Sequence, residues 1–273
     1  MHALTVPVES ERRVHGSGKS HGQKNRLLRS LPPDAYARVD AEFTAIPLAA
    51  DSVLFEYGDR AKQVYFPQDC VISLQLATRE GESVEFGMLG SEGVLGLETL
   101  FESGRTPGRA VVSRVGHALR VPTELLLESF RQYAPFRSGL LHFYAAFNTQ
   151  VVQRSICHRV HTIEQQLCTW LLLMHDRSDD DRLHCTHEEV GGFLGGRREG
   201  ISIAVRRLRN DGLVSSGYRC LVILDRRGLE ARSCECYGAI RAAYTAGDAT
   251  MRHSLTPVST RSNFAGIQNE TST

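Results

Sequence analysis

The pattern of apolar and polar positions changes several times along the chain, and each stretch predicts a different structure. Residues 1–24 are polar, with Gly, Ser, His and basic residues, and predict a disordered arm. A short amphipathic helix is predicted next, with the apolar positions Leu27, Leu28, Leu31, Tyr36, Val39 and Phe43. From Ile46 to about Val121, short apolar runs rich in Val, Ile, Phe and Tyr alternate with turn residues. Short strands at this spacing are typical of an antiparallel barrel or sandwich.

The pattern becomes helical at Pro122, and one helical stretch carries a regular apolar seam. Its members recur at spacings of four, three and four: Leu140, Tyr144, Phe147 and Val151. A seam of this kind is typical of helices that pair. Since a long helix between two compact domains cannot bury both faces in either one, we expect a second copy of the chain to cover the seam. The alternative is that the seam packs on the chain's own β domain.

Two short helices joined by a glycine turn are predicted in the C-terminal half. Thr186 is placed to cap the first helix, with Glu189 completing a capping box, and Gly195 is placed to end it in a left-handed conformation. The second helix runs from about Arg197 to Asn210, and the stretch CLVILDRR supplies the returning strand of a small hairpin, or wing. This arrangement is typical of a helix-turn-helix, whose second helix enters the major groove of DNA.

The first turn of that second helix carries side chains that can read bases. An arginine can pair bidentately with guanine, and a glutamate can accept a hydrogen bond from the cytosine amino group. Arginines further along the helix are expected to contact phosphates or the protein surface. The predicted DNA-binding residues are Thr186, Arg197, Arg198, Glu199, Ser202, Arg206 and Arg207. The alternative is a charged helix face that is only solvated.

The distribution of charge favours a nucleic-acid partner, although the net charge does not. The whole chain carries a formal net charge of +1. Residues 182–227, however, hold nine arginines against five acidic residues, a local excess of +4. A basic helix within a near-neutral chain is a candidate electrostatic footprint for double-stranded DNA.

Length and motifs argue against a membrane protein and against an enzyme. No apolar run approaches the roughly 18–20 residues that span a bilayer. The N-terminus has no apolar segment of the secretory type, so we expect a cytoplasmic protein. The sequence has no Walker-type phosphate loop, nucleophile elbow or HExxH motif, so no catalytic residue is predicted.

Seven cysteines are scattered along the chain and are expected to be reduced thiols. Cys234 and Cys236 are separated by one residue, which suits a soft metal or redox chemistry. The further ligands to consider are Cys185 with His187, or Cys157 with His158 and His161. None of these spacings is that of a zinc finger. The sequence therefore predicts ordinary thiols and surface histidines, with no metal and no cofactor.

The order of these parts resembles the Crp/Fnr superfamily of bacterial transcription regulators. The motifs that carry the resemblance are VYFPQDCVISL and EFGMLGSEGVLGLETL in the β-rich stretch, IEQQLCTWLLLMHDR before the helix pair, and HCTHEEVGGFLGGRREGISIAVRRLRNDGLV followed by VILDRRGLEARSCECY. Together they cover about residues 25–240. The resemblance implies an α+β fold, in which an N-terminal double-stranded β-helix (a jelly-roll-like β-roll) precedes a long dimerisation helix and a C-terminal winged helix-turn-helix.

The resemblance also implies a division of the chain and its partners. The expected parts are a disordered arm (1–24), a cyclic-nucleotide-binding-like sensor roll (25–135), a dimerisation helix (136–160), a winged helix-turn-helix domain (161–237) and a flexible tail (238–273). A homodimer would read a roughly palindromic site in double-stranded DNA, and RNA polymerase is a candidate partner. The alternative function is a ligand-binding or protein-interaction module that has a winged-helix shape and no sequence-specific DNA binding.

Within the reading helix, the sequence matches the family at two positions and departs from it at a third. Arg198 and Glu199 match the family's reading arginine and reading glutamate. Ile203 stands where the best-known members have a second arginine, five residues after the first. The resemblance therefore implies a base preference different from theirs.

The effector site departs further from the family pattern. Members that bind cyclic AMP carry Gly-Glu-Leu-Gly, whose glutamate holds the ribose hydroxyl, followed later by Arg-Ser-Ala or Arg-Thr-Ala, which hold the cyclic phosphate. The matching residues here are Gly93-Val94-Leu95-Gly96 and Arg109-Ala110-Val111, so the candidate effector residues are Gly93, Gly96 and Arg109. The side chains of Val94 and Ala110 form no hydrogen bonds, and each group left unpaired on a buried polar ligand costs about 1–3 kcal/mol. Cyclic AMP is therefore not expected to bind.

Two other sensing chemistries of the family receive no support from the sequence. An iron–sulfur centre of the Fnr type uses an N-terminal cysteine cluster, and no cysteine precedes Cys70. No histidine stands out as a haem ligand.

Overall fold

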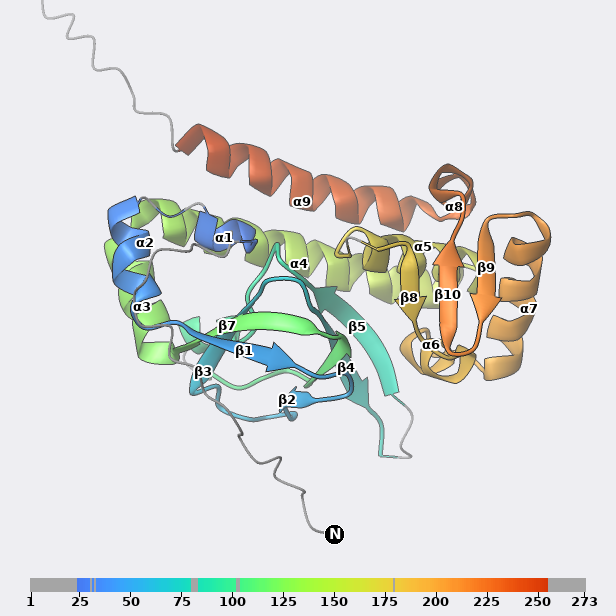
Figure 1. Cartoon of the computed structure of the whole chain (residues 1–273), viewed down its shortest axis with the longest axis horizontal. Coiled ribbons are helices and arrows are strands. Elements are labelled where there is room, and N and C mark those ends of the chain that lie inside the picture. Colours follow the sequence, from blue (N-terminus) through green and yellow to red (C-terminus); the bar gives the residue numbers. More distant parts are fainter. Residues whose placement is uncertain are drawn as a thin grey trace, which may run out of the picture.

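The structure is a computed structural model, and it describes residues 24–254 apart from residues 30, 32, 80–82, 102, 103 and 179. Three parts follow one another in the chain: a β-rich N-terminal domain, a long helix, and a small C-terminal domain of helices around a three-stranded sheet (Figure 1). This architecture confirms the predicted fold class. The predicted arm, residues 1–24, lies outside the described residues except for Lys24.

The N-terminal domain, here called the roll, is built from two antiparallel sheets. Their strand orders are β1-β7-β3 and β2-β6-β4-β5. The strands are β1 Thr44–Leu48, β2 Val53–Phe55, β3 Gln63–Pro67, β4 Val71–Ala77, β5 Ser83–Leu89, β6 Arg109–Arg114 and β7 Gly116–Pro122. One hydrophobic core draws side chains from both sheets, and Val64, Phe66 and Ile72 are at most 1% exposed in it. The inward-facing side chains of the two sheets therefore hold the roll together.

Short helices close the roll before the long helix begins. They are α1 Arg26–Arg29, α2 Pro33–Asp40, the 3₁₀ helix η1 Leu97–Leu100 and α3 Thr123–Gln132. The long helix, α4, spans Ala134–Val160, and its N-terminal half buries Phe136 and Leu140 in the core of the roll. Within the described residues, no helix combines the length and the apolar character that crossing a membrane requires.

A second long helix, α9 (Glu235–Ser254), lies along α4 (Figure 1). The sequence predicted a flexible tail from residue 238, and this prediction is wrong for residues 238–254. Tyr237, Ile240 and Tyr244 follow one another at spacings of three and four and turn inward, and the ring of Tyr244 contacts that of Phe143 in α4. The many Ala, Thr and Gly residues of this stretch concealed that apolar face. The remaining predicted tail, residues 255–273, lies outside the described residues.

The C-terminal domain packs its helices on a sheet of order β8-β10-β9. Its elements are α5 Ile163–His175, β8 Arg182–His184, α6 His187–Phe193, α7 Arg198–Asn210, β9 Val214–Gly217, β10 Cys220–Ile223 and α8 Arg226–Arg232. Trp170 of α5 stacks on Phe193 of α6 in its core, with ring centroids 5.7 Å apart. The capping box predicted for Thr186 and Glu189 is confirmed.

A buried polar network joins the roll, α4 and the C-terminal domain. Arg177, just after α5, donates from Nε to Oε1 of Glu92 at 2.7 Å and from Nη2 to Oε1 of Gln150 at 3.0 Å. Gln150 of α4 donates in turn to the carbonyl oxygen of Met88 in β5 at 2.9 Å. The ring of Tyr244 in α9 covers the guanidinium, with its centroid 5.2 Å from Cζ of Arg177. These contacts fix the parts of the molecule relative to one another.

Candidate functional site

A glycine turn places α7 on the outside of the C-terminal domain. Gly195 has a φ of +61°, so the predicted left-handed conformation is confirmed. The next residue, Gly196, donates its backbone N–H to the carbonyl oxygen of Gly191 at 2.8 Å. A Cβ atom on Gly191 would lie 3.0 Å from the carbonyl oxygen of Gly196, which is tighter than ordinary van der Waals contact. Glycine at these positions therefore permits the sharp turn that directs α7 away from α6.

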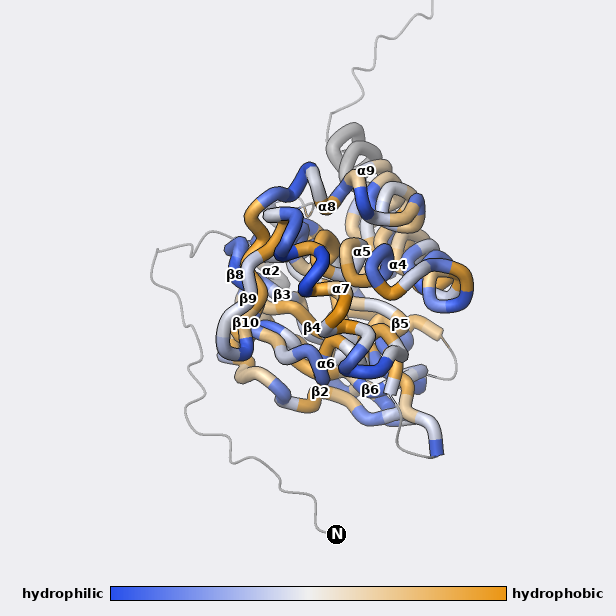
Figure 2. Tube along the Cα trace, turned by 90° about the vertical axis from the view of Figure 1, so that its right-hand side faces the viewer, coloured by the Kyte–Doolittle hydropathy of each residue, from blue (hydrophilic) through white to orange (hydrophobic). Residues whose placement is uncertain are grey.

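Helix α7 buries one face and presents the other to solvent. Ile201, Ala204, Val205 and Leu208 form the buried face. Figure 2 looks onto the end of the molecule that carries α6 and α7, which lie in front of the strands of the roll. A shallow groove on the outer face of α7 is lined by Arg198, Glu199, Ser202, Ile203 and Arg206. The fold therefore gathers on one surface four of the seven residues predicted to bind DNA.

Three arginines at this surface have no acidic partner among the residues that the structure describes. Arg197, Arg198 and Arg206 are exposed, and none of them forms an ion pair with another residue that the structure describes. Glu199 is exposed as well. Such side chains are available to phosphate oxygens and to base edges.

The other predicted DNA-binding residues have partners within the chain. Thr186 is the N-cap of α6, so its hydroxyl is used in capping. Oγ of Ser202 is hydrogen-bonded to Nδ1 of His187 at 3.0 Å. Nη1 of Arg207 lies 3.6 Å from Oε2 of Glu164 in α5, which directs the guanidinium away from the groove.

His187 stands beside the groove, in contact with one of the residues that line it. Burial, and to a smaller extent the positive charge of Arg198, lower the pKa of His187 below its ordinary value. The lowered pKa favours the uncharged imidazole, whose Nδ1 is hydrogen-bonded to the hydroxyl of Ser202.

The hairpin of β9 and β10 supplies a surface residue that is not among the predicted DNA-binding residues. Tyr218, at the tip of the turn, is 95% exposed. The next residue, Arg219, has a φ of +48° and places Nη2 2.8 Å from Oε1 of Glu189. The signal in the sequence was an aromatic residue in a polar turn of the predicted wing. An exposed phenol at a wing tip is suited to a hydrogen bond with a phosphate.

The roll contains a cavity of about 600 Å³ between its second sheet and α4. The lining is mainly apolar, with side chains such as Leu74, Phe86 and Phe143. Of the predicted effector residues, Gly96 lines this cavity, with a φ of +98°. Gly93 instead lets the loop approach α4, because a Cβ atom there would lie 2.4 Å from Cε2 of Phe143.

The third predicted effector residue, Arg109, is not part of the cavity lining. Its side chain is 47% exposed, and Nε lies 3.2 Å from Oε1 of the exposed Glu56. Val94 and Ala110, which stand where a cyclic-nucleotide site has polar side chains, are 2% and 1% exposed. The structure therefore does not bring the three predicted effector residues together around one ligand position.

The ionisable side chains that line the cavity include Glu85, Arg154 and His158. Burial raises the pKa of Glu85 to about 7, against the opposing effects of Arg154 and of the hydrogen bond from Ser73. Burial lowers the pKa of His158. Nε, Nη1 and Nη2 of Arg154 have no hydrogen-bond partner among the residues that the structure describes, although the residue is 1% exposed. A buried guanidinium of this kind requires a compensating negative charge.

The residues of the apolar seam predicted on α4 lie mainly against the chain's own roll, and other residues of α4 form its exposed apolar face. Leu140 has no exposed surface and belongs to the core of the roll, so its assignment to a dimer seam is wrong. Phe147 and Val151 line the cavity, and Tyr144, 43% exposed, contacts the ring of Phe101. The reason is that the roll packs against the face of α4 that carries the most regular apolar spacing. The large apolar side chains that α4 leaves exposed are Leu141, Tyr144, Val152, Ile156 and Val160.

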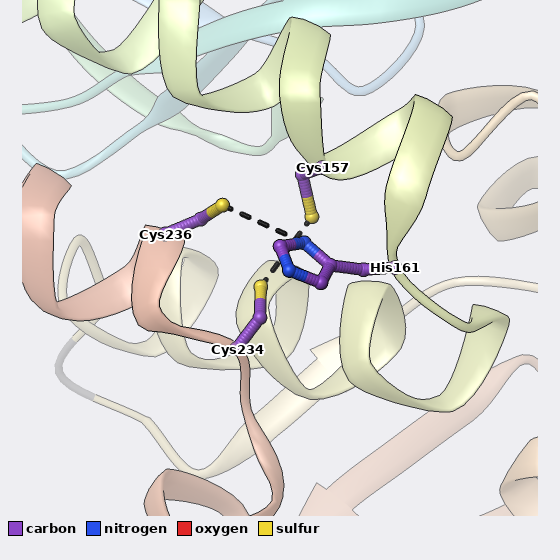
Figure 3. Close-up of side chains that lie close together, drawn as sticks. All are labelled: Cys157, His161, Cys234 and Cys236. Carbon is purple, nitrogen blue, oxygen red and sulfur yellow. Dashed lines mark hydrogen bonds between the residues drawn. The ribbon is translucent and has the colours of Figure 1, made fainter.

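Four residues able to bind a metal lie together where α4 ends and α9 begins (Figure 3). They are Cys157, His161, Cys234 and Cys236. Their spacing in the sequence is not that of a zinc finger, and for this reason no metal was predicted there. His158 is not part of the group: its Nδ1 lies 3.1 Å from the carbonyl oxygen of Leu194, and its Nε2 lies 3.3 Å from that of Glu85. All seven cysteines are free and buried.

Comparisons with known proteins agree with this arrangement of parts. Residues 45–133 match the family model of the cyclic nucleotide-binding domain, and residues 165–232 match that of the Crp-like helix-turn-helix domain. The chain is 24% identical over 180 residues to the transcriptional regulator SdrP of Thermus thermophilus, a match that covers 63% of this chain and 83% of that protein.

Solved structures of transcription regulators share the fold. FixK2 from Bradyrhizobium japonicum superposes with a TM-score of 0.60 at 18% sequence identity, covering 70% of this chain and 98% of FixK2. The global regulator CLP of Xanthomonas campestris, described as responsive to c-di-GMP, superposes with a TM-score of 0.54 at 16% identity, covering 71% of this chain and all of CLP. With both domains matched in the same order and α4 between them, the chain belongs to the Crp/Fnr family of transcription regulators.

Proposed function

We propose that the chain acts as a homodimer that reads a roughly palindromic DNA site through α7, in the cytoplasm. The observation that carries the proposal is the groove on the outer face of α7. It combines exposed cations with a carboxylate acceptor in the first turn of the helix, where a helix-turn-helix protein contacts base edges. Arg198 and Glu199 are assigned to bases, and Arg206 and Tyr218 to phosphates.

The proposed dimer rests on the exposed apolar face of α4. Leu141, Val152, Ile156 and Val160 are each 47% to 65% exposed, although they stand on the central helix of the molecule. Three successive intervals between Leu141, Ala145, Asn148 and Val152 are four, three and four residues, as in a helix that pairs. Two copies joined along this face would each present an α7, which is the arrangement that a palindromic site requires.

The effector is proposed to be something other than cyclic AMP. The cavity has an apolar lining, and the arginine that corresponds to the family's phosphate ligand is turned outward to Glu56. Entry of a cyclic nucleotide would leave its ribose hydroxyl and phosphate without the partners they need, at about 1–3 kcal/mol for each unpaired group.

Selection of genomic DNA fragments by the purified full-length protein tests the proposal. Affinity for the recovered motif and for a scrambled version is then measured by fluorescence anisotropy at several salt concentrations. We expect the motif to bind at least about 10³-fold more tightly than random DNA, with affinity falling steeply as salt rises. Arg198→Ala should lose about 1–3 kcal/mol on the motif and relax its base preference at one position of each half-site.

Arg131→Ala is the matched control, because Arg131 is exposed on α3 and far from α7 in the fold. It should bind the motif as the wild type does. Equal affinity of the wild type for selected and scrambled fragments would reject the proposal and favour an interaction module that only has the shape of a winged helix.

A further inference from the structure

The four residues at the junction of α4 and α9 have the geometry of a closed site for one metal ion (Figure 3). All of their ligand atoms lie within 4.8 Å of one another. Sγ of Cys157 lies 3.5 Å from Sγ of Cys234, and Sγ of Cys236 lies 3.7 Å from Nδ1 of His161. A tetrahedral zinc site has Zn–S bonds of about 2.3 Å and Zn–N bonds of about 2.0–2.1 Å, so its ligand atoms stand about 3.5–3.8 Å apart. The two contacts have the length of edges of such a tetrahedron.

We propose that Cys157, His161, Cys234 and Cys236 bind one Zn²⁺ ion through three thiolates and one imidazole. Soft thiolate ligands in a tetrahedral set with a single nitrogen favour zinc among the common divalent ions. The three cysteines are 0%, 4% and 1% exposed, and a site closed in this way is structural rather than catalytic. The ligand atoms are also too close together to hold a multi-iron cluster, whose cysteine sulfurs are bound to separate iron atoms.

The surroundings of the ligands support the assignment. Nδ1 of His161 faces the cysteines, while Nε2 lies 3.3 Å from Oε1 of Glu235. A carboxylate that holds the outer nitrogen of a histidine orients the ring and leaves the inner nitrogen as the ligand, as in many zinc sites. Thr169 of α5 lies with Oγ1 3.2 Å from Sγ of Cys234 and can donate a hydrogen bond to a bound thiolate.

The net charge of the occupied site would be opposite in sign to that of the nearby Arg154. Three thiolates and a divalent cation carry a net charge of −1. Arg154 stands one turn before Cys157 on α4, and its positive charge acts on both Cys157 and Glu85. The site would therefore supply a negative charge near a buried guanidinium whose nitrogen atoms have no hydrogen-bond partner among the described residues.

The position of the site gives the ion a mechanical role that does not depend on the proposed function. Cys157 and His161 are four residues apart, so they share one face at the C-terminal end of α4. Cys234 and Cys236 flank the point where α8 gives way to α9. One ion would join these two places, next to the short link between α4 and α5 through which the chain enters its C-terminal domain.

Metal analysis of the full-length protein tests the proposal. After reconstitution with excess Zn²⁺ and removal of unbound metal, inductively coupled plasma mass spectrometry should find about one zinc per chain, and less than about a tenth of that in Cys234→Ser. Co²⁺ added to chelator-treated wild type should give the intense visible absorption of a tetrahedral thiolate site, a readout that requires no variant. Glu235→Gln, a change at a side chain that is 80% exposed, should weaken zinc binding about 10–100-fold without loss of folding.

Cys220→Ser is the matched control, because Cys220 is also a buried cysteine but lies in β10, outside the group. It should keep about the zinc content of the wild type. Three results would each overturn the proposal: no more zinc in the wild type than in Cys234→Ser, a Co²⁺ spectrum without tetrahedral thiolate bands, or a Cys157–Cys234 disulfide in the protein as isolated.

Discussion

Arg177 of the C-terminal domain and Glu92 of the roll form an ion pair whose side chains are only 3% and 4% exposed. The guanidinium also donates from Nη1 to the carbonyl oxygen of Leu173 at 2.9 Å, so the buried cation is satisfied on several sides. Because the carboxylate lies 85 residues earlier in the chain, this pair ties together segments that no local structure connects.

Removal of one partner from this pair should destabilise the protein strongly. Arg177→Met leaves the Glu92 carboxylate buried without its cation, and breaking a buried pair in this way costs about 3–5 kcal/mol. Urea unfolding followed by circular dichroism measures the loss. Arg109→Met, which removes an exposed partner of Glu56, should cost less than about 1 kcal/mol. If both variants lost a similar free energy of unfolding, burial would not be the reason that the Arg177–Glu92 pair matters.

The two classes of arginine on α7 should respond differently to substitution. Arg206→Ala is expected to weaken binding to all DNA sequences alike and to reduce the slope of log affinity against log salt by about 1. Arg198→Ala should change the ranking of base substitutions within the motif instead. Anisotropy titrations with a panel of single-base variants at three salt concentrations separate these effects. If Arg206→Ala alters the ranking and Arg198→Ala does not, the assignment of roles is wrong.

Stability should depend on pH through Glu85. Its pKa is raised, chiefly by burial, from 4.5 to about 7, so the folded state binds this proton more tightly than the unfolded chain does. The contribution to stability is fully present below pH 4.5 and is lost as the pH rises through 7. Relative to Glu85→Gln, the wild type should therefore lose up to about 3 kcal/mol between pH 5 and pH 8.

Urea unfolding of both proteins at pH 5, 6.5 and 8 measures this difference directly. Glu188→Gln, which changes an exposed carboxyl on α6, is the control for general effects of a lost charge. A free-energy difference between wild type and Glu85→Gln that does not vary with pH would contradict the prediction.

Substitution on the exposed face of α4 should separate the two copies of the proposed dimer. Ile156→Glu places a charge on a side chain that is 47% exposed in the single chain, so folding should survive while pairing is lost. Light scattering coupled to size-exclusion chromatography should report a mass near 30.3 kDa for this variant and twice that for the wild type. Val115→Glu, at an exposed apolar residue between β6 and β7, should remain a dimer. Identical masses for wild type and Ile156→Glu would refute the assigned face.

Cyclic AMP should not stabilise the protein. A ligand that binds the folded state raises its stability by about 2.7 kcal/mol at a hundredfold excess over the dissociation constant, which a thermal-shift assay detects readily. We expect no shift with cyclic AMP across a wide concentration range. A shift that grows with concentration and disappears in Gly96→Ala, at a left-handed residue of the cavity lining, would show that a nucleotide does enter the roll.

Local signals in the sequence predicted the helix-turn-helix well, because each signal acts over a few residues. The cap at Thr186 and the left-handed Gly195 depend on neighbours within about one turn, and both are confirmed. The face of α4 that meets the roll could not be predicted in this way. A regular apolar spacing at Leu140 shows that a face is buried, but it does not show whether the cover is the chain's own domain or a partner.

Contacts between segments far apart in the chain could not be predicted from the spacing of residues in the sequence. Cys157 and Cys234 are 77 residues apart, and no zinc-finger pattern links them, so only the packing of α9 on α4 reveals that they meet. The same packing explains why the helix after residue 238 was missed. The apolar positions of α9 are few, and their partners lie on another helix and beside Arg177.

The return of α9 to α4 limits how the DNA-binding part can move. A domain attached by a single linker reorients freely, whereas this domain is connected to α4 at both of its ends. The chain enters the domain directly after α4 and leaves it through α9, which packs back on α4. A change in the orientation of α7 would then require α9 to shift along α4 or to separate from it. A conformational change that starts in the roll would therefore have to disrupt the packing of α9 on α4. Truncation within α9 would leave the C-terminal domain connected to α4 at one end only, with greater freedom to reorient.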